Sequence, residues 1–168
     1  YQMLALPIVP PDIRRSLEGS LRYYRKNGEC VHCGIIKFEM QKGVRIVYEN
    51  DCVVVLAPFA SRAPYELRIF PKQHQSRFED SEDNVLFCAA DALVKVLTAI
   101  KEKLGDPDYN FFLHTSPFHG RQEYSHYHWH MEVIPKLSLF GGFEWSTGID
   151  INSVDPDAAA ELLRSAIK

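Results

Sequence analysis

Polar and apolar side chains alternate along residues 125–135, which read SHYHWHMEVIP. Neighbouring side chains of a β-strand point to opposite faces, so this alternation predicts a strand with one polar and one apolar face. The apolar face would carry Tyr127, Trp129, Met131 and Val133. The polar face, which we call the histidine row, would carry His126, His128, His130 and Glu132. Buried imidazoles and carboxylates need partners, so the row predicts metal binding or nucleotidyl transfer.

Other segments with a strand pattern precede the histidine row. Residues 45–49 and 52–58 are rich in β-branched side chains and flank Asn50 and Asp51, which favour a hairpin turn. Residues 65–71 form a third such segment, closed by the sequence PKQH at 71–74. We expect these three strands to form an antiparallel meander. A further strand is expected over residues 109–115.

The apolar period changes from two to three or four at residues 81–83. Apolar side chains between positions 85 and 104 keep this helical spacing, which predicts a long amphipathic helix that Gly105 and Pro107 end and that packs on the sheet. Shorter helices are expected over residues 12–25 and, capped by Asp155, over residues 156–167. The glycine-rich residues 139–152 are expected to form a strand or loop. The predicted fold class is α+β, with an antiparallel sheet, a long helix packed on it and a C-terminal helix.

Composition limits the partners of this chain. Its 168 residues, 46% of them hydrophobic, suffice for one domain with one core, and no apolar run is long enough to span a membrane. The net charge is −3 without a Lys/Arg cluster, which argues against nucleic acid as the main partner. Residues 1–13 lack the features of a signal peptide, and their start at Tyr1 leads us to expect a piece of a longer protein. We expect a cytoplasmic domain with small-molecule partners.

The four cysteines favour a metal site over a disulfide framework. Cys30 and Cys33 form a Cys-x-x-Cys turn, which supplies two of the four ligands of a structural zinc ion. His74 and one member of the histidine row would complete the site. Cys52 and Cys88 are interpreted as plain buried thiols. The remaining histidines, for which we expect hydrogen-bonded or solvated side chains, are His32, His114 and His119.

Residues 42–135, together with the upstream Cys-x-x-Cys, resemble the histidine-triad fold. The features that carry this resemblance are APFA at 57–60, PKQH at 71–74, the long helix, and a row of the form His-x-His-x-(His/Gln)-x-x-Pro. Nearly the whole chain resembles the C-terminal half of the galactose-1-phosphate uridylyltransferase family, close to its plant-type ADP-glucose phosphorylases. The segments behind this closer resemblance are residues 2–11, 57–60, 71–74, 106–117 and 141–152. It implies that residues 1–168 form one histidine-triad-like domain, the second of two repeats, with residues 1–11 as the exit of the first.

The resemblance also implies a reaction. Family members transfer a nucleotide from a nucleoside diphosphate sugar to a hexose 1-phosphate through a nucleotidyl-histidine, whose histidine would lie just upstream of Tyr1. Gln2 would then hydrogen-bond the phosphate of that intermediate. Phe143 and Glu144, with Asn152 beside them, match the segment that contacts the hexose, often across a dimer interface. This chain would be the zinc-binding, sugar-contacting half, in a homodimer or beside a partner repeat.

Two registers fit the triad. Counting back from Pro135 places His128 first, His130 in the middle and Glu132 third; the alternative triad is His126, His128 and His130. The first register agrees with the family's zinc pattern, which would here be Cys30, Cys33, His74 and His128.

In the family that this chain resembles, the middle position supplies the nucleophile, and a neutral imidazole there can attack the α-phosphorus. His130 is equipped for this. The resemblance, however, implies that the second repeat has lost the role, and Glu132 would face an anionic phosphate with nothing basic in the row except His126. Two alternatives stay open: a free-standing histidine-triad nucleotide hydrolase that uses His130, and a non-catalytic zinc-stabilised binding domain.

Finally, apolar residues at 3–9 and 137–143 are expected to leave uncovered surface that a partner repeat or a second chain buries.

Overall fold

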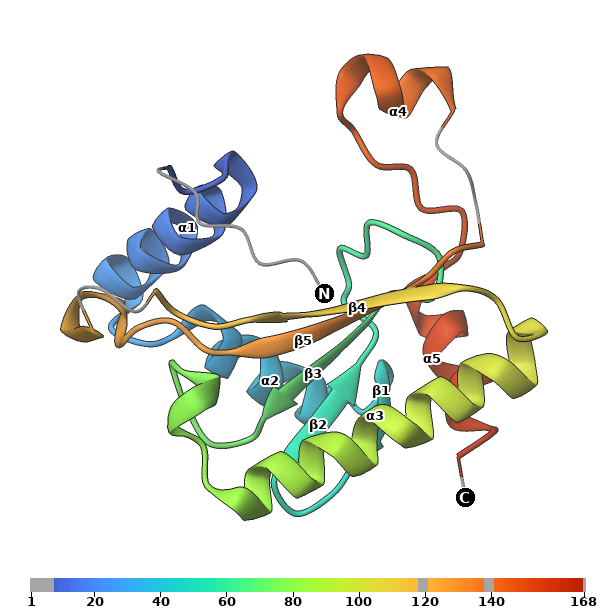
Figure 1. The fold of residues 1–168 in the computed structure, drawn as a ribbon, viewed down its shortest axis with the longest axis horizontal. Helices are drawn as coiled ribbons and strands as arrows, with labels where there is room; N and C mark the ends of the chain where they lie inside the picture. The colour runs from blue at the N-terminus through green and yellow to red at the C-terminus, as the bar shows by residue number, and fades with distance from the viewer. Residues whose placement is uncertain (1–7, 118–120, 138–140, 168) are drawn as a thin grey trace.

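A five-stranded antiparallel sheet forms the centre of the molecule in the computed structural model, which describes residues 8–117, 121–137 and 141–167. The strand order is β1-β2-β3-β5-β4 (Figure 1). The strands are β1 (Ile46–Glu49), β2 (Val53–Leu56), β3 (Leu67–Pro71), β4 (Tyr109–His114) and β5 (His130–Pro135). The hairpin and the meander are confirmed for β1 to β3. Strand β5 then pairs between β3 and β4, which leaves β4 at the edge.

Helices cover both faces of the sheet. The described helices are α1 (Pro11–Asn27), α2 (Val31–Lys42), α3 (Asp83–Leu104), α4 (Gly142–Thr147) and α5 (Pro156–Arg164), with short 3-10 turns at Phe78–Asp80 and Arg121–Tyr124. The predicted α+β fold, with a long helix on the sheet and a C-terminal helix, is confirmed. Among the described helices, none combines the length and apolar character that a membrane span requires.

Strand β2 shows why the sheet needs a layer on each side. All four of its residues are buried. Val53 and Val55 belong to the main core, which α3 and α5 complete, whereas Val54 and Leu56 pack with Ile36 of α2 on the other face. Successive strand residues point to opposite faces, so an unbroken apolar run is buried on both.

Helix α2 was not expected, because the Cys-x-x-Cys was interpreted as a turn. In the structure Cys30 is the N-cap and the helix begins at Val31. Its buried residues are His32, Ile36 and Glu39. Two of the three are polar, so the apolar periodicity that reveals a helix in a sequence is missing here. The helix ends at Gly43, whose φ of 70° is readily adopted by glycine.

The glycine-rich segment is also different from its prediction. Residues 142–147 form helix α4 instead of a strand or loop, and the Glu144 carboxylate accepts a hydrogen bond from the backbone N–H of Gly141 at its start. Figure 1 shows α4 standing away from the sheet. The cap predicted at Asp155 is confirmed, because its carboxylate accepts hydrogen bonds from the N–H groups of Asp157 and Ala158.

The histidine row lies only partly on a strand. Strand β5 begins at His130, and residues 127–129 lead into it without regular structure. Trp129 and Val133 lie in the main core with Met131 packed against it, as the alternation predicts. The ring of Tyr127 instead lies 6.1 Å from that of His130 and 6.2 Å from that of His32, on the histidine side. The strict alternation therefore fails where the strand has not yet started.

Candidate metal centre and histidine row

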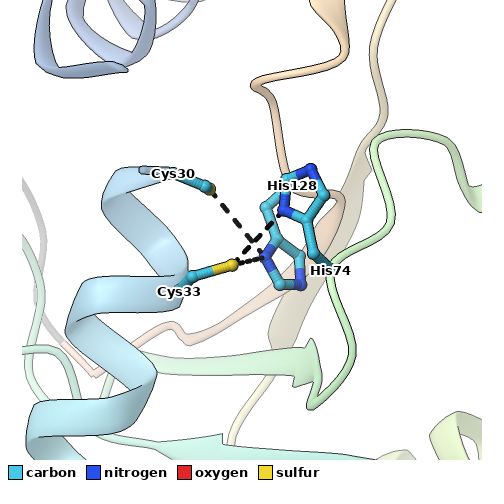
Figure 2. Close-up of side chains that lie close together, drawn as sticks. All are labelled: Cys30, Cys33, His74 and His128. Carbon is cyan, nitrogen blue, oxygen red and sulfur yellow. Dashed lines mark hydrogen bonds between the residues drawn. The ribbon is translucent and has the colours of Figure 1, made fainter. Parts of the chain in front are cut away.

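Two cysteines and two histidines from three segments of the chain meet between α2 and the sheet. We call Cys30, Cys33, His74 and His128 the Cys/His cluster, and one ligand atom from each lies within 4.8 Å of all the others. Sγ of Cys33 is 3.3 Å from Nδ1 of His74 and 3.5 Å from Nδ1 of His128, and Sγ of Cys30 is 4.0 Å from Nδ1 of His128. Figure 2 shows both thiols facing the two imidazoles. His126 is not a member.

Local structure explains how these side chains are held. Cys30 and Cys33 are three residues apart at the start of α2, so their side chains share one side of the helix. Nε2 of His74 donates a hydrogen bond to the carbonyl of Ser125 (2.8 Å), and Nε2 of His128 donates to the carbonyl of Pro71 (3.0 Å). These bonds orient both rings so that Nδ1 is directed at the thiols, which is the usual outer support of metal-binding histidines.

The electrostatics of the cluster favour a thiolate. Burial alone would raise the pKa of Cys30, but hydrogen bonds to His128 and His74 outweigh it and lower this pKa to about 5. Burial and the neighbouring Cys30 raise the pKa of Cys33 to about 12. The contact with Cys30 also raises the pKa of His74. The donor atoms are thus arranged for a cation that would replace the shared protons.

The geometry fits a zinc ion. Zinc bound to two thiolates and two imidazoles at its usual bond lengths separates neighbouring ligand atoms by about 3.6 Å. The three measured separations of 3.3, 3.5 and 4.0 Å lie around this value. Cys30 and His128 are buried, whereas Cys33 is half-buried and His74 is exposed, so the cluster lies at the edge of the protein interior. The cluster therefore offers four ligand atoms at separations close to those around a tetrahedral metal ion.

His130 lies next to the cluster in a closed environment. Its Nδ1 donates to the carbonyl of His128 (3.1 Å), which leaves Nε2 as the nitrogen with the free lone pair. Its ring is packed by the rings of His114, His32 and Phe70, whose centroids lie 4.8, 4.9 and 5.1 Å away. Burial lowers the pKa of His130, so the imidazole is neutral. Only 3% of the residue is exposed.

Glu132 is held by two arginines that sequence reasoning missed. Arg62 lies 2.7 Å and Arg68 3.1 Å from its carboxylate oxygens. Burial alone would raise the pKa of Glu132, but His114, His130, Arg68 and Arg62 lower it far below its usual range. The sequence-based expectation considered only the histidine row, in which His126 was the one basic candidate, whereas both arginines lie outside that row. The pairing of β3 with β5 sets Arg68 opposite Glu132, and this pairing could not be predicted from the sequence pattern.

The other histidines are less well satisfied than expected. His32 is buried, and its Nδ1 has no hydrogen-bond partner among the described residues. Nε2 of His126 and Nε2 of His114 also have no hydrogen-bond partner among the described residues, and Nε2 of His114 lies 3.8 Å from the Glu132 carboxylate. The expectation of hydrogen-bonded or solvated side chains is thus wrong for Nδ1 of His32 and Nε2 of His114. His119 lies outside the described residues.

The residues expected to contact a sugar do not join the cluster. Phe143 is half-exposed on α4, and Glu144 lies on the same helix with its carboxylate at the N-terminal cap. Figure 1 shows this helix apart from the sheet that carries His130. The side chain of Asn152 accepts a hydrogen bond from the N–H of Val154 (3.0 Å). Gln2 lies outside the described residues.

Comparisons with known proteins agree with this architecture. The HIT domain family matches residues 39–138. An ADP-glucose phosphorylase of Arabidopsis thaliana is 37% identical over 97% of this chain and 45% of its own length. A galactose-1-phosphate uridylyltransferase of Thermotoga maritima is 30% identical over 97% of this chain and 53% of its own length.

Solved structures extend the likeness to the fold. The crystal structure of an ADP-glucose phosphorylase from Arabidopsis thaliana with bound ADP-glucose superimposes with a TM-score of 0.84 at 35% identity, over 95% of this chain and 50% of that one. The chain therefore spans about half the length of these relatives. With its antiparallel sheet and its family match over residues 39–138, the chain belongs to the HIT domain family and is close to plant ADP-glucose phosphorylase.

Proposed function

We propose that this chain is the zinc-binding, sugar-contacting half of a nucleotidyltransferase that acts on a nucleoside diphosphate hexose. This proposal rests on the similarity to an ADP-glucose phosphorylase, which extends along 97% of this chain but only 45% of that protein. This ratio supports a protein of two repeats in which residues 1–168 form the second. The reaction transfers the nucleotide to a histidine of the first repeat, releases hexose 1-phosphate, and passes the nucleotide to a phosphate-bearing acceptor.

Zinc in the Cys/His cluster is part of this proposal. The cluster supplies two thiols and two imidazoles, and backbone carbonyls orient both rings. Zinc bound there by Cys30, Cys33, His74 and His128 serves folding, because four protein ligands leave no open position for a substrate. The metal would fix the start of α2 against the segment that precedes β5.

His130 has a supporting and not a nucleophilic role in this proposal. An attack on phosphorus requires Nε2 to reach the substrate, but this nitrogen lies 3.8 Å from the Glu132 carboxylate in a residue that is 3% exposed. Arg62 and Arg68 hold that carboxylate in place. One observation favours the alternative of a histidine-triad hydrolase. The hydrogen bond from Nδ1 of His130 to the carbonyl of His128 selects the tautomer whose Nε2 carries the free lone pair that a nucleophile needs.

The sugar contacts are assigned to α4 and the segment after it. Phe143 offers an exposed aromatic face for a hexose ring, and the Glu144 carboxylate keeps one oxygen beyond the bond that caps its helix. Since α4 stands away from the sheet, these residues would serve an active site on a second subunit. The proposed assembly is a homodimer.

A labelling experiment tests the proposed function. The full-length protein is incubated with a nucleoside diphosphate hexose labelled at the α-phosphate and quenched in alkali, which preserves phosphoramidates. We expect label on a histidine of the first repeat, and its release as a new nucleotide product after addition of inorganic phosphate or hexose 1-phosphate. Label on His130 would instead support the hydrolase alternative, and a full-length protein that takes up no label and forms no product would contradict both.

A further inference from the structure

Two thiols outside the candidate site lie side by side. Cys52 precedes β2, and Cys88 lies on α3. Both residues are partly exposed, so the prediction of plain buried thiols is only partly right. Both pack against the main core, and the neighbouring Cys88 thiol is the first of the causes that raise the pKa of Cys52. Asn50 fixes their backbones, since its Nδ2 donates to the carbonyl of Cys88 (3.0 Å) and its Oδ1 accepts from the N–H of Cys52 (3.2 Å).

One of the two thiols can be approached from a cleft. A cavity of about 410 Å³ lies beside the start of α3, and its lining includes Cys52, Lys72 and Gln75. Cys88 is not among the lining residues. A small molecule in the cleft therefore lies against Cys52 and not against Cys88.

We propose that Cys52 and Cys88 form a reversible disulfide when a low-molecular-weight disulfide such as oxidised glutathione enters this cleft. The Cys52 thiolate attacks one sulfur of glutathione disulfide, which breaks its S–S bond and releases one glutathione. The Cys88 thiol then loses its proton and attacks the Cys52 sulfur of the mixed disulfide, which releases the second glutathione. The two protein thiols give up two electrons and two protons, and the oxidant takes them up as two glutathione thiols.

This cross-link would act on the strand end that orients His128. The carbonyl of Cys52 accepts a hydrogen bond from the N–H of Lys72 (2.7 Å). The carbonyl of Pro71, the residue before Lys72, accepts a hydrogen bond from Nε2 of His128. A bond from Cys52 to α3 ties this end of β2 and β3 to the long helix. The closed loop of the chain also restricts the unfolded state, so the oxidised protein should melt at a higher temperature.

The test uses the zinc-loaded protein, so that Cys30 and Cys33 are occupied. The protein is equilibrated with oxidised glutathione, its remaining thiols are blocked with N-ethylmaleimide, and its peptides are mapped by mass spectrometry. We expect a linked pair of peptides that contain Cys52 and Cys88, two hydrogens lighter than the free pair, and their separation after dithiothreitol.

Single variants separate this cross-link from other thiol chemistry. Cys88→Ser should leave Cys52 as a stable glutathione adduct, and Cys52→Ser should slow the modification of Cys88. Cys88→Ala serves the same purpose if serine disturbs the helix. The proposal is overturned if the wild-type protein, in excess oxidised glutathione, shows only adducts, only bonds between different chains, or no change at either cysteine.

Discussion

Nε2 of His130 lies 3.8 Å from Oε1 of Glu132, so the only nitrogen of this ring that could attack a phosphorus faces an anchored carboxylate. This relationship separates His130 from a working nucleophile. A phosphate group brought to Nε2 would meet the negative charge of Glu132 and would have to enter a buried site.

The first prediction concerns this ring. In the full-length protein, His130→Asn should leave turnover within a few-fold of the wild type, because the nucleotide is carried by the first repeat in our proposal. Replacement of the first-repeat histidine by glycine should abolish turnover. Initial rates with a nucleoside diphosphate hexose measure both. A His130→Asn variant that retains its fold by circular dichroism but loses all turnover would contradict the proposed division of roles.

The second prediction concerns zinc. The purified chain should contain about one zinc ion, because the cluster provides one complete set of four ligands. Cys33→Ser should lose the metal and melt at a clearly lower temperature, since a structural zinc ion contributes about 10–16 kcal/mol to the folding of its site. Cys88→Ser is the matched control and should keep the metal. Elemental analysis and thermal melts measure this, and a metal-free chain purified without chelators would be evidence against the cluster as a zinc site.

The third prediction concerns the pH dependence of stability. Since the folded-state pKa of Glu132 is depressed, its stabilisation is present above the unfolded pKa of about 4.3 and is lost as the pH falls below that value. Glu132→Gln should therefore lower the free energy of unfolding by about 2–3 kcal/mol at neutral pH. The difference from wild type should shrink in acid.

Urea unfolding at several pH values measures this difference. The exposed Glu161 offers a matched control, since Glu161→Gln should unfold like the wild type. An effect of Glu132→Gln that stays constant from neutral to acidic pH would show that the charge of Glu132 is not responsible.

The fourth prediction concerns the proposed sugar contact. Glu144→Gln keeps a carbonyl oxygen for the N–H of Gly141, so helix α4 should persist while the charged acceptor for sugar hydroxyls is lost. In the full-length protein we expect kcat/KM for the hexose substrate to fall by about tenfold or more, with little change in melting temperature. Glu161→Gln again serves as the control. Unchanged steady-state kinetics would remove Glu144 from the site.

The fifth prediction concerns assembly. Edge strand β4 exposes Phe111 to 50% on the described surface, and Ile8, Val9, Leu137 and Phe143 are also exposed at the ends where uncovered apolar surface was expected. The isolated chain should therefore self-associate with increasing concentration. Phe111→Glu should shift it toward the monomer, whereas Phe87→Glu on the exposed side of α3 should not. Light scattering that finds a monomer at every concentration would oppose this.

Local sequence determined most of the regular structure. The helix from 83 to 104 and the cap at Asp155 could be predicted, because both depend on residues within a few positions of one another. The alternation after His130 likewise predicted which side of β5 faces the core. The Cys-x-x-Cys indicated a metal site because its two thiols are close in any compact conformation.

Only the tertiary structure decided what surrounds these features. Helix α2 buries His32 and Glu39, so it carries no apolar period, and α4 is held by a cap within a segment that glycine makes ambiguous. The choice of His128 over His126 as the neighbour of Cys33, and the clamp of Arg62 and Arg68 on Glu132, depend on contacts between distant segments. Such contacts follow from the pairing of β3 with β5 and the docking of α2. Periodicity records which face of an element is buried, but it does not record which element buries it.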